Sequence, residues 1–455
     1  MSNSNVSTAL LLLFLLLIPL LGLSHAEEPA PLSMDVPIGT LTLREAQRMA
    51  LASSPSIEEA LARIQASQAV LDQARSSLQP TANFYAGYRN QDSSLQPDWA
   101  PEVQVRDNLN ISNVGIQANW LIFDGFSRRA LILASQHGVK ASEQILGETR
   151  RLLAEAVATA YYQAQLAVES MLIAQQNHIF NRALEKEADI RWQVGSIPEA
   201  DKLNFSVRAL QAGTDFIKEE QIFEIVTTVL AELMALPEAK LPEEMYPVRN
   251  EDGGTTRSIP SYEEEFSYAL QNRPDLKALQ SNIAALQENK KAKKGDYSPK
   301  VFLNGGFDYT KMTDIGAIDQ EEHDAFAGLS LSWDLYKGGE RLAKIREVDQ
   351  IIRATRQQQQ QMTLAIQSAI RQSIATVKAT RIMSDRRKLS LALTARIRDH
   401  VEKAYRAGAA TLTRLNEAQT DLVRASGAEA ASRINYLLAL QQLDAASSRI
   451  LDGID

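Results

Sequence analysis

The residue types that carry most protein chemistry are few in this chain and lie far apart. No pair of histidines has the HExxH spacing with which a helix binds catalytic zinc. The absence of cysteine excludes a disulfide, a thiolate nucleophile and a cysteine-bound zinc ion. No phosphate-binding glycine loop or GxSxG motif occurs. We therefore predict no enzyme, cofactor or metal site. His25 belongs to the N-terminal signal described below, and the remaining histidines are predicted to be solvated helix or loop residues, namely His137, His178, His323 and His400.

One segment has the composition of a cation site. Residues 311–325 are rich in carboxylates, namely Asp314, Asp319, Glu321, Glu322 and Asp324. Carboxylates bind divalent cations, but a solvated loop, or a loop that repels anions, explains the same composition. The whole chain has a formal charge of −8 and no basic stripe. Nucleic acid is therefore not an expected partner.

The N-terminus has the pattern of a secretory signal. Ala9–Leu23 is an apolar run of 15 residues, shorter than an ordinary membrane-spanning helix. Ser24 and Ala26 then place small residues where signal peptidase cleaves. We predict a signal peptide over residues 1–26. An uncleaved anchor is the alternative, because no lysine or arginine precedes the apolar run. No later segment approaches 18 uninterrupted apolar residues, so any later membrane crossing is expected to be made of strands.

The chain repeats itself once. Residues near 43–80 correspond to residues near 263–299 at a shift of 219, and later positions correspond at a shift of 213. A change of shift indicates a surface loop of different length in each half. The aligned pairs are Pro55 and Pro274, Pro80 and Pro299, Trp120 and Trp333, and Gly195 and Gly408. The sequence predicts one repeat over 27–236, a linker rich in proline, glycine and charge over 237–260, and a second repeat over 261–455.

Strand patterns flank the variable loop in each half. Apolar and polar residues alternate over the predicted strands, which are 82–90, 113–123, 301–310 and 326–336. Strands of about ten residues with one apolar and one polar face are typical of a membrane barrel with a wet lumen. Two soluble hairpins packed on a core are the alternative, which the strand pattern by itself would favour.

Two very long helices follow the strands. Residues 128–193 and 340–407 contain no proline, and a continuous helix of that length spans about 100 Å. Each has a heptad seam rich in small residues. The seams are Leu153, Val157, Ala160, Ala164, Ala167, Met171 and Ala174, and Ile366, Ile370, Ser373, Val377, Thr380 and Ser384. An ordinary dimeric coiled coil is the alternative, although such seams usually prefer leucine and isoleucine. Each long helix ends near a glycine, and a second helix runs back over about 199–236 or 411–451.

This order of features resembles the TolC family of outer-membrane efflux proteins. The resemblance covers nearly everything after the signal, and it rests on Leu43–Leu51, Pro55, Trp120–Gly125, Gly195 and Gly408. It implies a mainly α-helical homotrimer in which four strands per copy complete a twelve-stranded barrel in outer-membrane lipid, continued by a helical periplasmic tunnel. Four strands cannot close on themselves, and open edges in lipid leave backbone groups unpaired.

The resemblance also implies a function. Family members are passive exit ducts for tripartite efflux or type I secretion. They work with a periplasmic adaptor protein and an inner-membrane transporter, and they lie in the outer membrane and extend into the periplasm. The cargo stays open among drugs, metals and proteins. Two other classes are alternatives: a trimeric coiled-coil adhesive or structural surface protein, and a periplasmic enzyme or adaptor with a helical hairpin.

The resemblance places a periplasmic gate near the turns at Gly195 and Gly408. Tyr405 matches the family's gate tyrosine, and Asp201 matches an aspartate of the first half. The expected arginine is missing, because Ala410 stands in its place. Two further aspartate positions hold Arg414 and Glu417. The usual ion pair is therefore absent. An Asp201–Arg414 contact is one interpretation, and solvated tip residues are the other.

Overall fold

The computed structural model describes residues 41–95, 105–242, 245, 247, 258–314 and 320–454. The predicted signal peptide lies outside the described residues, and so does most of the predicted linker. Residues from Thr40 onward form one compact unit.

Two short helices, two strands, a long helix and a shorter helix follow one another, and this order occurs twice. The first set is α2 (Leu43–Ser53), α3 (Pro55–Ser76), β1 (Thr81–Leu95), β2 (Val105–Phe123), α4 (Ser127–Gln193) and α5 (Glu199–Leu233). The second set is α6 (Tyr262–Asn272), α7 (Pro274–Gly295), β3 (Lys300–Asp314), β4 (Gln320–Ser332), α8 (Glu340–Arg406) and α9 (Leu412–Ser447). Short 3₁₀ turns occupy Pro237–Ala239 (η1) and Arg449–Leu451 (η2).

Local sequence explains where the short helices begin. Thr42 and Glu45 form a reciprocal capping box at the start of α2. Pro55 and Pro274 occupy the first turn of α3 and α7, where a missing N–H costs nothing. Each proline therefore separates two helices that are adjacent in the chain.

The four strands form one antiparallel sheet in the order β1-β2-β3-β4. Phe84, Ile116, Phe307 and Ala325 lie in one row across the sheet. The next row consists of Tyr85, Gly115, Asp308 and Asp324. Because successive side chains point to opposite faces, the register gathers the apolar residues on one face and most polar residues on the other.

The observed strands differ from the predicted ranges at their ends. The strand predicted to reach residue 336 stops at Ser332. Its neighbour β3 begins at Lys300, which pairs with Ser332, so residues 333–336 have no strand to pair with. Within the acidic segment 311–325, the described residues 311–314 and 320–325 are strand and not the solvated loop that composition suggested. Glu321, Glu322 and Asp324 lie on β4, because both strands of the hairpin extend further than their apolar alternation indicates.

The long helices are continuous, as the absence of proline predicted. Both α4 and α8 contain 67 residues. All but one of the predicted seam residues of α4 are buried, Met171 being half-buried. In α8, Ile374 is buried and the predicted Ser373 is only half-buried. Both positions lie one helical turn from Ile370, and the larger apolar side chain occupies the core. Over the described part of the chain, no helix combines the length and apolar character that crossing a membrane requires.

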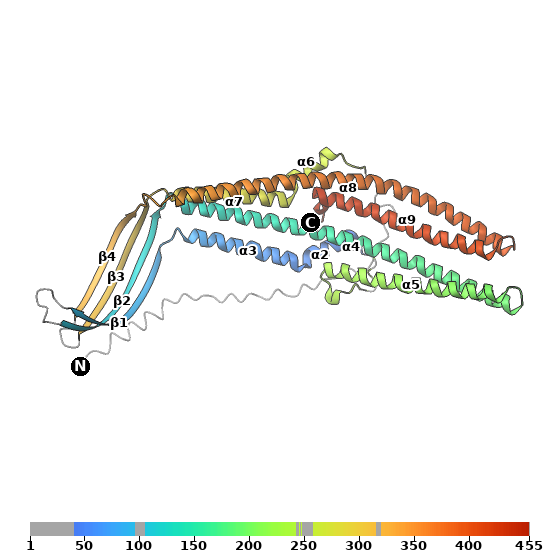
Figure 1. Cartoon of the computed structure of the whole chain (residues 1–455), viewed down its shortest axis with the longest axis horizontal. Helices are drawn as coiled ribbons and strands as arrows, with labels where there is room; N and C mark the ends of the chain where they lie inside the picture. The colour runs from blue at the N-terminus through green and yellow to red at the C-terminus, as the bar shows by residue number, and fades with distance from the viewer. Residues whose placement is uncertain are drawn as a thin grey trace. The chain divides into compact units, whose positions relative to one another are not determined.

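The helices form an open layer. Figure 1 shows α4 between α3 and α7, and further along between α5 and α9, with α8 against α7 and α9. The first-half elements β1, α3 and α5 therefore lie at one edge of the layer. The second-half elements β4 and α8 lie at the other edge. Strands β1 and β4 each pair on one side only within the described chain.

Candidate functional site

The two helical hairpins end in matching turns. Gly195 has φ +74° and Gly408 has φ +76°, a left-handed conformation that L side chains rarely adopt. The amide of Gly195 donates to the Trp192 carbonyl at 2.8 Å, and that of Gly408 donates to the Tyr405 carbonyl at 2.9 Å. The next amide in each turn reaches back five residues, which completes a Schellman motif. Both predicted turn glycines thus close the ends of long helices.

The tips of the two hairpins pack on each other. Leu184, Ala188, Phe205 and Leu415 form a buried cluster from α4, α5 and α9. Tyr405 on α8 packs against this cluster. This cluster holds the two hairpins together near their tips, beyond the part of the long helices that packs against α6 and α7.

A polar contact joins the hairpins beside this cluster. The Arg191 guanidinium donates to the Tyr405 hydroxyl at 3.4 Å, and its carbon lies 5.3 Å from the centre of the tyrosine ring. Arg191 also pairs with Glu187 on its own helix. Burial raises the pKa of Tyr405, the Arg191 charge opposes this, and the Glu187 and Asp201 charges add to it. Tyr405 therefore stays a neutral hydrogen-bonding group at physiological pH.

The remaining predicted gate residues fall into two places. Asp201 lies in the first turn of α5, where a carboxylate interacts favourably with the helix dipole, and its charge acts on Tyr405. Arg414 pairs with Glu417 on α9 at 3.2 Å, and these side chains are 57% and 56% exposed. Within the described residues of one chain, Arg414 therefore pairs with Glu417 and not with Asp201.

Sequence reasoning missed several charged residues at the tip. Lys202 lies 2.7 Å from a carboxylate oxygen of Asp189 and 3.9 Å from the centre of the Trp192 ring. Arg191 was also missed, although its four-residue spacing from Glu187 is a recognisable helix pair. The two Lys202 contacts tie α5 to α4, whereas the Arg191–Glu187 pair lies within α4.

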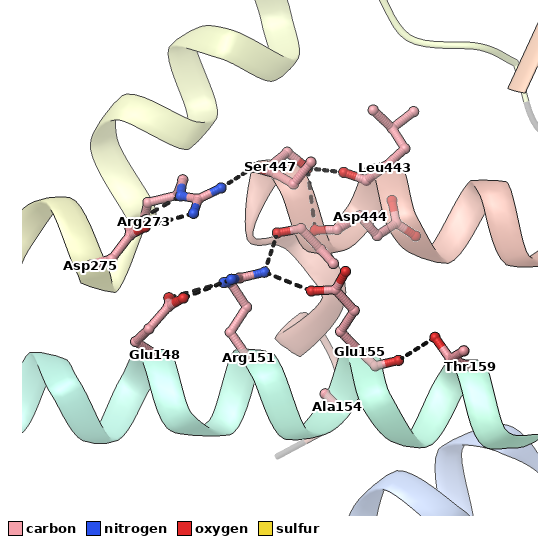
Figure 2. A network of polar contacts seen from close by, with 12 residues as sticks. Glu148, Arg151, Ala154, Glu155, Thr159, Arg273, Asp275, Leu443, Asp444 and Ser447 are labelled. Atoms are coloured by element: carbon pink, nitrogen blue, oxygen red, sulfur yellow. Dashed lines mark hydrogen bonds and ion pairs between the residues drawn. The ribbon is translucent and has the colours of Figure 1, made fainter. Parts of the chain in front are cut away.

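A second polar cluster lies far from the tip, where α9 ends against α4 and α7. Figure 2 shows Arg151 between Glu148 and Glu155 on α4. The Arg151 guanidinium donates to Glu148 at 2.6 and 2.9 Å, to Glu155 at 3.0 Å, and to the carbonyl of Ala445 at 3.0 Å. The Arg151 side chain is only 7% exposed. We call this cluster, together with Arg273 and Asp275, the α9 joint.

The second arginine of the α9 joint comes from the other half of the chain. Arg273 pairs with Asp275 through two hydrogen bonds of 2.6 and 3.1 Å and donates to the carbonyl of Ala446 at 2.9 Å (Figure 2). The last carbonyls of a helix lack their usual partners within it. The two arginines donate to consecutive carbonyls at the end of α9, and the Ala445 carbonyl also accepts from the Ser448 amide at 3.1 Å. Burial acts to raise the pKa of Asp275, but hydrogen bonds and charge from Arg273 outweigh it and lower the pKa.

These features define a class of protein. A small antiparallel sheet is continued by helices of 67 residues that fold back as two hairpins. The CmeC outer membrane channel of Campylobacter jejuni has this fold, with a TM-score of 0.74 over 89% of this chain and 85% of CmeC at 16% identity. The chain therefore shares its fold with this channel protein.

The family follows from the sequence comparisons. The Outer membrane efflux protein family matches residues 47–221 and 266–449, and the chain belongs to this family. Protein CyaE of Bordetella pertussis is 24% identical over 85% of this chain and 79% of its own length. Outer membrane efflux protein BepC of Brucella suis is 24% identical over 76% of each chain. The resemblance to the TolC family is confirmed.

Family membership establishes the function and the cellular location of this chain at the level of the family. The chain is an outer-membrane exit channel for efflux, and it extends into the periplasm. The family and the structural neighbours are transport channels. The adhesive or structural coiled-coil alternative has no support from these comparisons.

Proposed function

We propose that three copies of the chain close into one ring that forms the exit duct. The open layer is the observation that carries this proposal, since β1 and β4 each leave one edge unpaired in the described chain. An unpaired strand edge in lipid costs several kcal/mol for each unsatisfied backbone group. Pairing β4 of one copy with β1 of the next removes both edges. Three copies then supply a barrel of twelve strands.

The helices continue the ring as a periplasmic tunnel. The same element order occurs in both halves, and the family matches each half separately. Both observations support a tandem repeat over 27–236 and 261–455 that gives the tunnel wall its alternating hairpins. Residues 1–26 are proposed to be removed as a signal peptide, so the mature chain begins at Glu27.

The duct works passively in tripartite efflux or type I secretion. An inner-membrane transporter supplies the energy, a periplasmic adaptor binds the tunnel, and the chain needs no cofactor and catalyses no reaction. Family membership and the two exposed hairpin turns support this assignment. The tips at Gly195 and Gly408 form the periplasmic mouth. Asp201, Tyr405, Arg414 and Glu417 are candidate gate residues.

The proposed ring is tested by disulfide crosslinking, because the chain has no cysteine of its own. One cysteine replaces Ala86 on the apolar face of β1. A second replaces, in turn, Ala325, Ala327 or Leu329 on the same face of β4. We expect one pairing to convert monomers into covalent trimers in outer-membrane fractions. Asp324→Cys, on the other face of β4, is the matched control. No intermolecular crosslink from any apolar-face pair would contradict strand closure.

A further inference from the structure

A dense group of basic residues surrounds the place where α7 and α8 meet the sheet. Residues 288–300 and 333–347 contain nine basic and five acidic side chains, although the whole chain has a charge of −8. Figure 1 shows α7 and α8 reaching the strands at the same end of the helical layer. We call the nine basic residues the basic collar. They are Lys290, Lys291, Lys293, Lys294, Lys300, Lys337, Arg341, Lys344 and Arg346.

The internal repeat shows that the fold does not require these charges. The corresponding residues of the first half are 69–81 and 120–134, which contain only three basic and two acidic side chains. Ala74 and Leu131 stand where the second half has Lys293 and Lys344. Both halves nevertheless form the same order of helix, strand and long helix at this point. The additional positive charge of the second half therefore serves something other than the common fold.

Aromatic residues mark a membrane boundary beside the basic collar. Trp120 lies in one row with Leu303 and Leu329 on the apolar face of the sheet. Its indole donates to a backbone carbonyl before β1 at 2.8 Å, and the Trp333 indole donates to the Tyr297 carbonyl at 3.1 Å. Tryptophan and tyrosine concentrate where the hydrocarbon of a membrane meets its headgroups. In a barrel embedded in lipid, the ends of β2 and β4 therefore lie at the headgroup level on the periplasmic side.

The segment after β4 joins exposed apolar residues to the basic collar. Leu335 is 76% exposed and Tyr336 is 86% exposed, and Lys337 follows them directly. On α7, Lys294 lies three residues before Tyr297, whose carbonyl accepts the tryptophan hydrogen bond. Exposed apolar residues flanked by lysine are typical of a segment at a membrane surface, because the long lysine side chain reaches the phosphate level.

Part of the basic collar has charge to offer a ligand. Six of its residues pair with carboxylates of their own chain. Within the part of the chain that the structure describes, Lys293, Lys294 and Arg346 form no ion pair. Lys294 and Arg346 are exposed, and Lys293 is half-buried. Helix α7 packs between α4 and α8 (Figure 1), so its two lysines do not lie at an edge of the layer.

We propose that the basic collar binds the phosphate headgroups of anionic phospholipids in the inner leaflet of the outer membrane. The apolar face of the sheet, the aromatic residues and the basic collar follow one another along the chain's long elements. A lipid leaflet presents hydrocarbon, interface and phosphate in the same order. Basic residues next to a membrane attract anionic lipids. The inference rests on the proposed ring, which places the strands in lipid, and it adds the lipid class that the ring selects.

Electron paramagnetic resonance with spin-labelled lipids measures this selection. The mature chain is reconstituted in phosphatidylcholine vesicles that contain a trace of spin-labelled phosphatidylglycerol or spin-labelled phosphatidylcholine. Lipid held at the protein surface gives a motionally restricted signal, whose fraction yields a relative association constant. We expect wild type to favour phosphatidylglycerol about fivefold at low salt, the factor that one basic residue at a membrane surface contributes. The preference should fall as the salt concentration rises.

A double variant tests the two unpaired lysines of α7. Lys293→Gln with Lys294→Gln is expected to lose most of the preference for phosphatidylglycerol, and glutamine preserves the helix because its helix propensity is similar. Lys293→Arg with Lys294→Arg keeps the charge and should keep the preference. The matched control is Lys186→Gln with Lys403→Gln, which removes the same charge from exposed positions near the hairpin turns. It should behave as wild type.

The outcomes separate the basic collar from the ring. Equal association of both lipids with wild type, or a preference equally strong in both glutamine variants, would overturn the proposal. A changed ion selectivity of the Lys293→Gln, Lys294→Gln channel with unchanged lipid association would place these lysines in the duct and also overturn it. A restricted signal without preference leaves the ring standing. If neither lipid gives a restricted signal, the strands do not contact lipid and the ring itself fails.

Discussion

The α9 joint and the hairpin tip both use arginine–carboxylate contacts, but the two regions differ in burial and connectivity. Arg151 is 7% exposed and bonds to two carboxylates and a carbonyl of another helix. At the tip, Arg414 is mostly exposed and bonds to one neighbour on its own helix. The joint therefore links α4, α7 and α9, whereas that tip pair links nothing beyond α9.

This difference separates a fixed region from a region that can move. Removing one partner from a buried ion pair leaves an uncompensated charge, while an exposed pair contributes little. The joint is expected to hold the upper part of the tunnel in one arrangement. At the tip, the Arg191–Tyr405 contact and a small apolar cluster are the main links between hairpins. Opening of the duct is therefore expected at the tip.

The largest expected effect is at Arg151. Arg151→Ala leaves Glu148 and Glu155 without their partner and removes one of the two hydrogen bonds to the Ala445 carbonyl, which still accepts from the Ser448 amide. We expect the free energy of unfolding to fall by about 3–5 kcal/mol. The free energy of unfolding is measured by denaturant titration in detergent, monitored by circular dichroism. A loss no greater than that of Arg63→Ala, at an exposed pair on α3, would remove the distinction between the regions.

A smaller effect with a defined pH dependence is expected at Asp275. Its pKa is lowered in the folded chain, so its ion pair stabilises the fold above the ordinary carboxylate pKa of about 4. That stabilisation is lost as pH falls through the lowered value. Wild type should exceed Asp275→Asn in thermal stability at pH 7, and the difference should vanish in strong acid. A difference that persists unchanged at acid pH would exclude ionisation as its cause.

The turn glycines are expected to have a moderate effect. Gly408→Ala forces a left-handed alanine, at a cost of about 1–2 kcal/mol. No atom lies close enough to obstruct the added methyl group, so backbone strain is the only cause. Hydrogen exchange should rise in the last turns of α8 and the first turns of α9. Gly427→Ala, inside α9 with equally open surroundings, should not raise exchange there.

The smallest effect is expected at Arg414. Its pair with Glu417 is exposed, and such pairs contribute about 0–1 kcal/mol. Arg414→Ser should leave the midpoint of thermal unfolding nearly unchanged. A large loss of stability would mean that Arg414 contacts a neighbouring copy, as the Asp201–Arg414 hypothesis requires. The double variant with Asp201→Ala then tests whether the two residues act together.

The sequence predicted the long elements well because their signals are local. Absence of proline fixed the extent of α4 and α8, and glycines marked both turns. Strand ends were less predictable, because β4 stops where β3 has no residue left to pair. The end of β4 is set by the neighbouring strand β3, so the sequence of residues 333–336 does not indicate it.

The polar contacts could not be predicted because they join distant parts of the chain. Arg151 bonds to a carbonyl 294 residues away, and Arg273 to one 173 residues away. Helical periodicity places Arg151 on a helix, but it does not show which helix end the side chain reaches. Arg191 was missed for the same reason, since its partner Tyr405 belongs to the other hairpin.

Single-channel recording in planar bilayers tests most directly the central claim that this chain forms an exit duct closed at its hairpin tips. We compare wild type with Arg191→Ala and Tyr405→Ala, and use Arg63→Ala as the control. Wild type should conduct weakly. If each tip variant removes about 1.4 kcal/mol from the closed state, its open-to-closed ratio should rise about tenfold, while the control stays at the wild-type value. Intact trimers that never conduct, or identical openings in all four proteins, would contradict the claim.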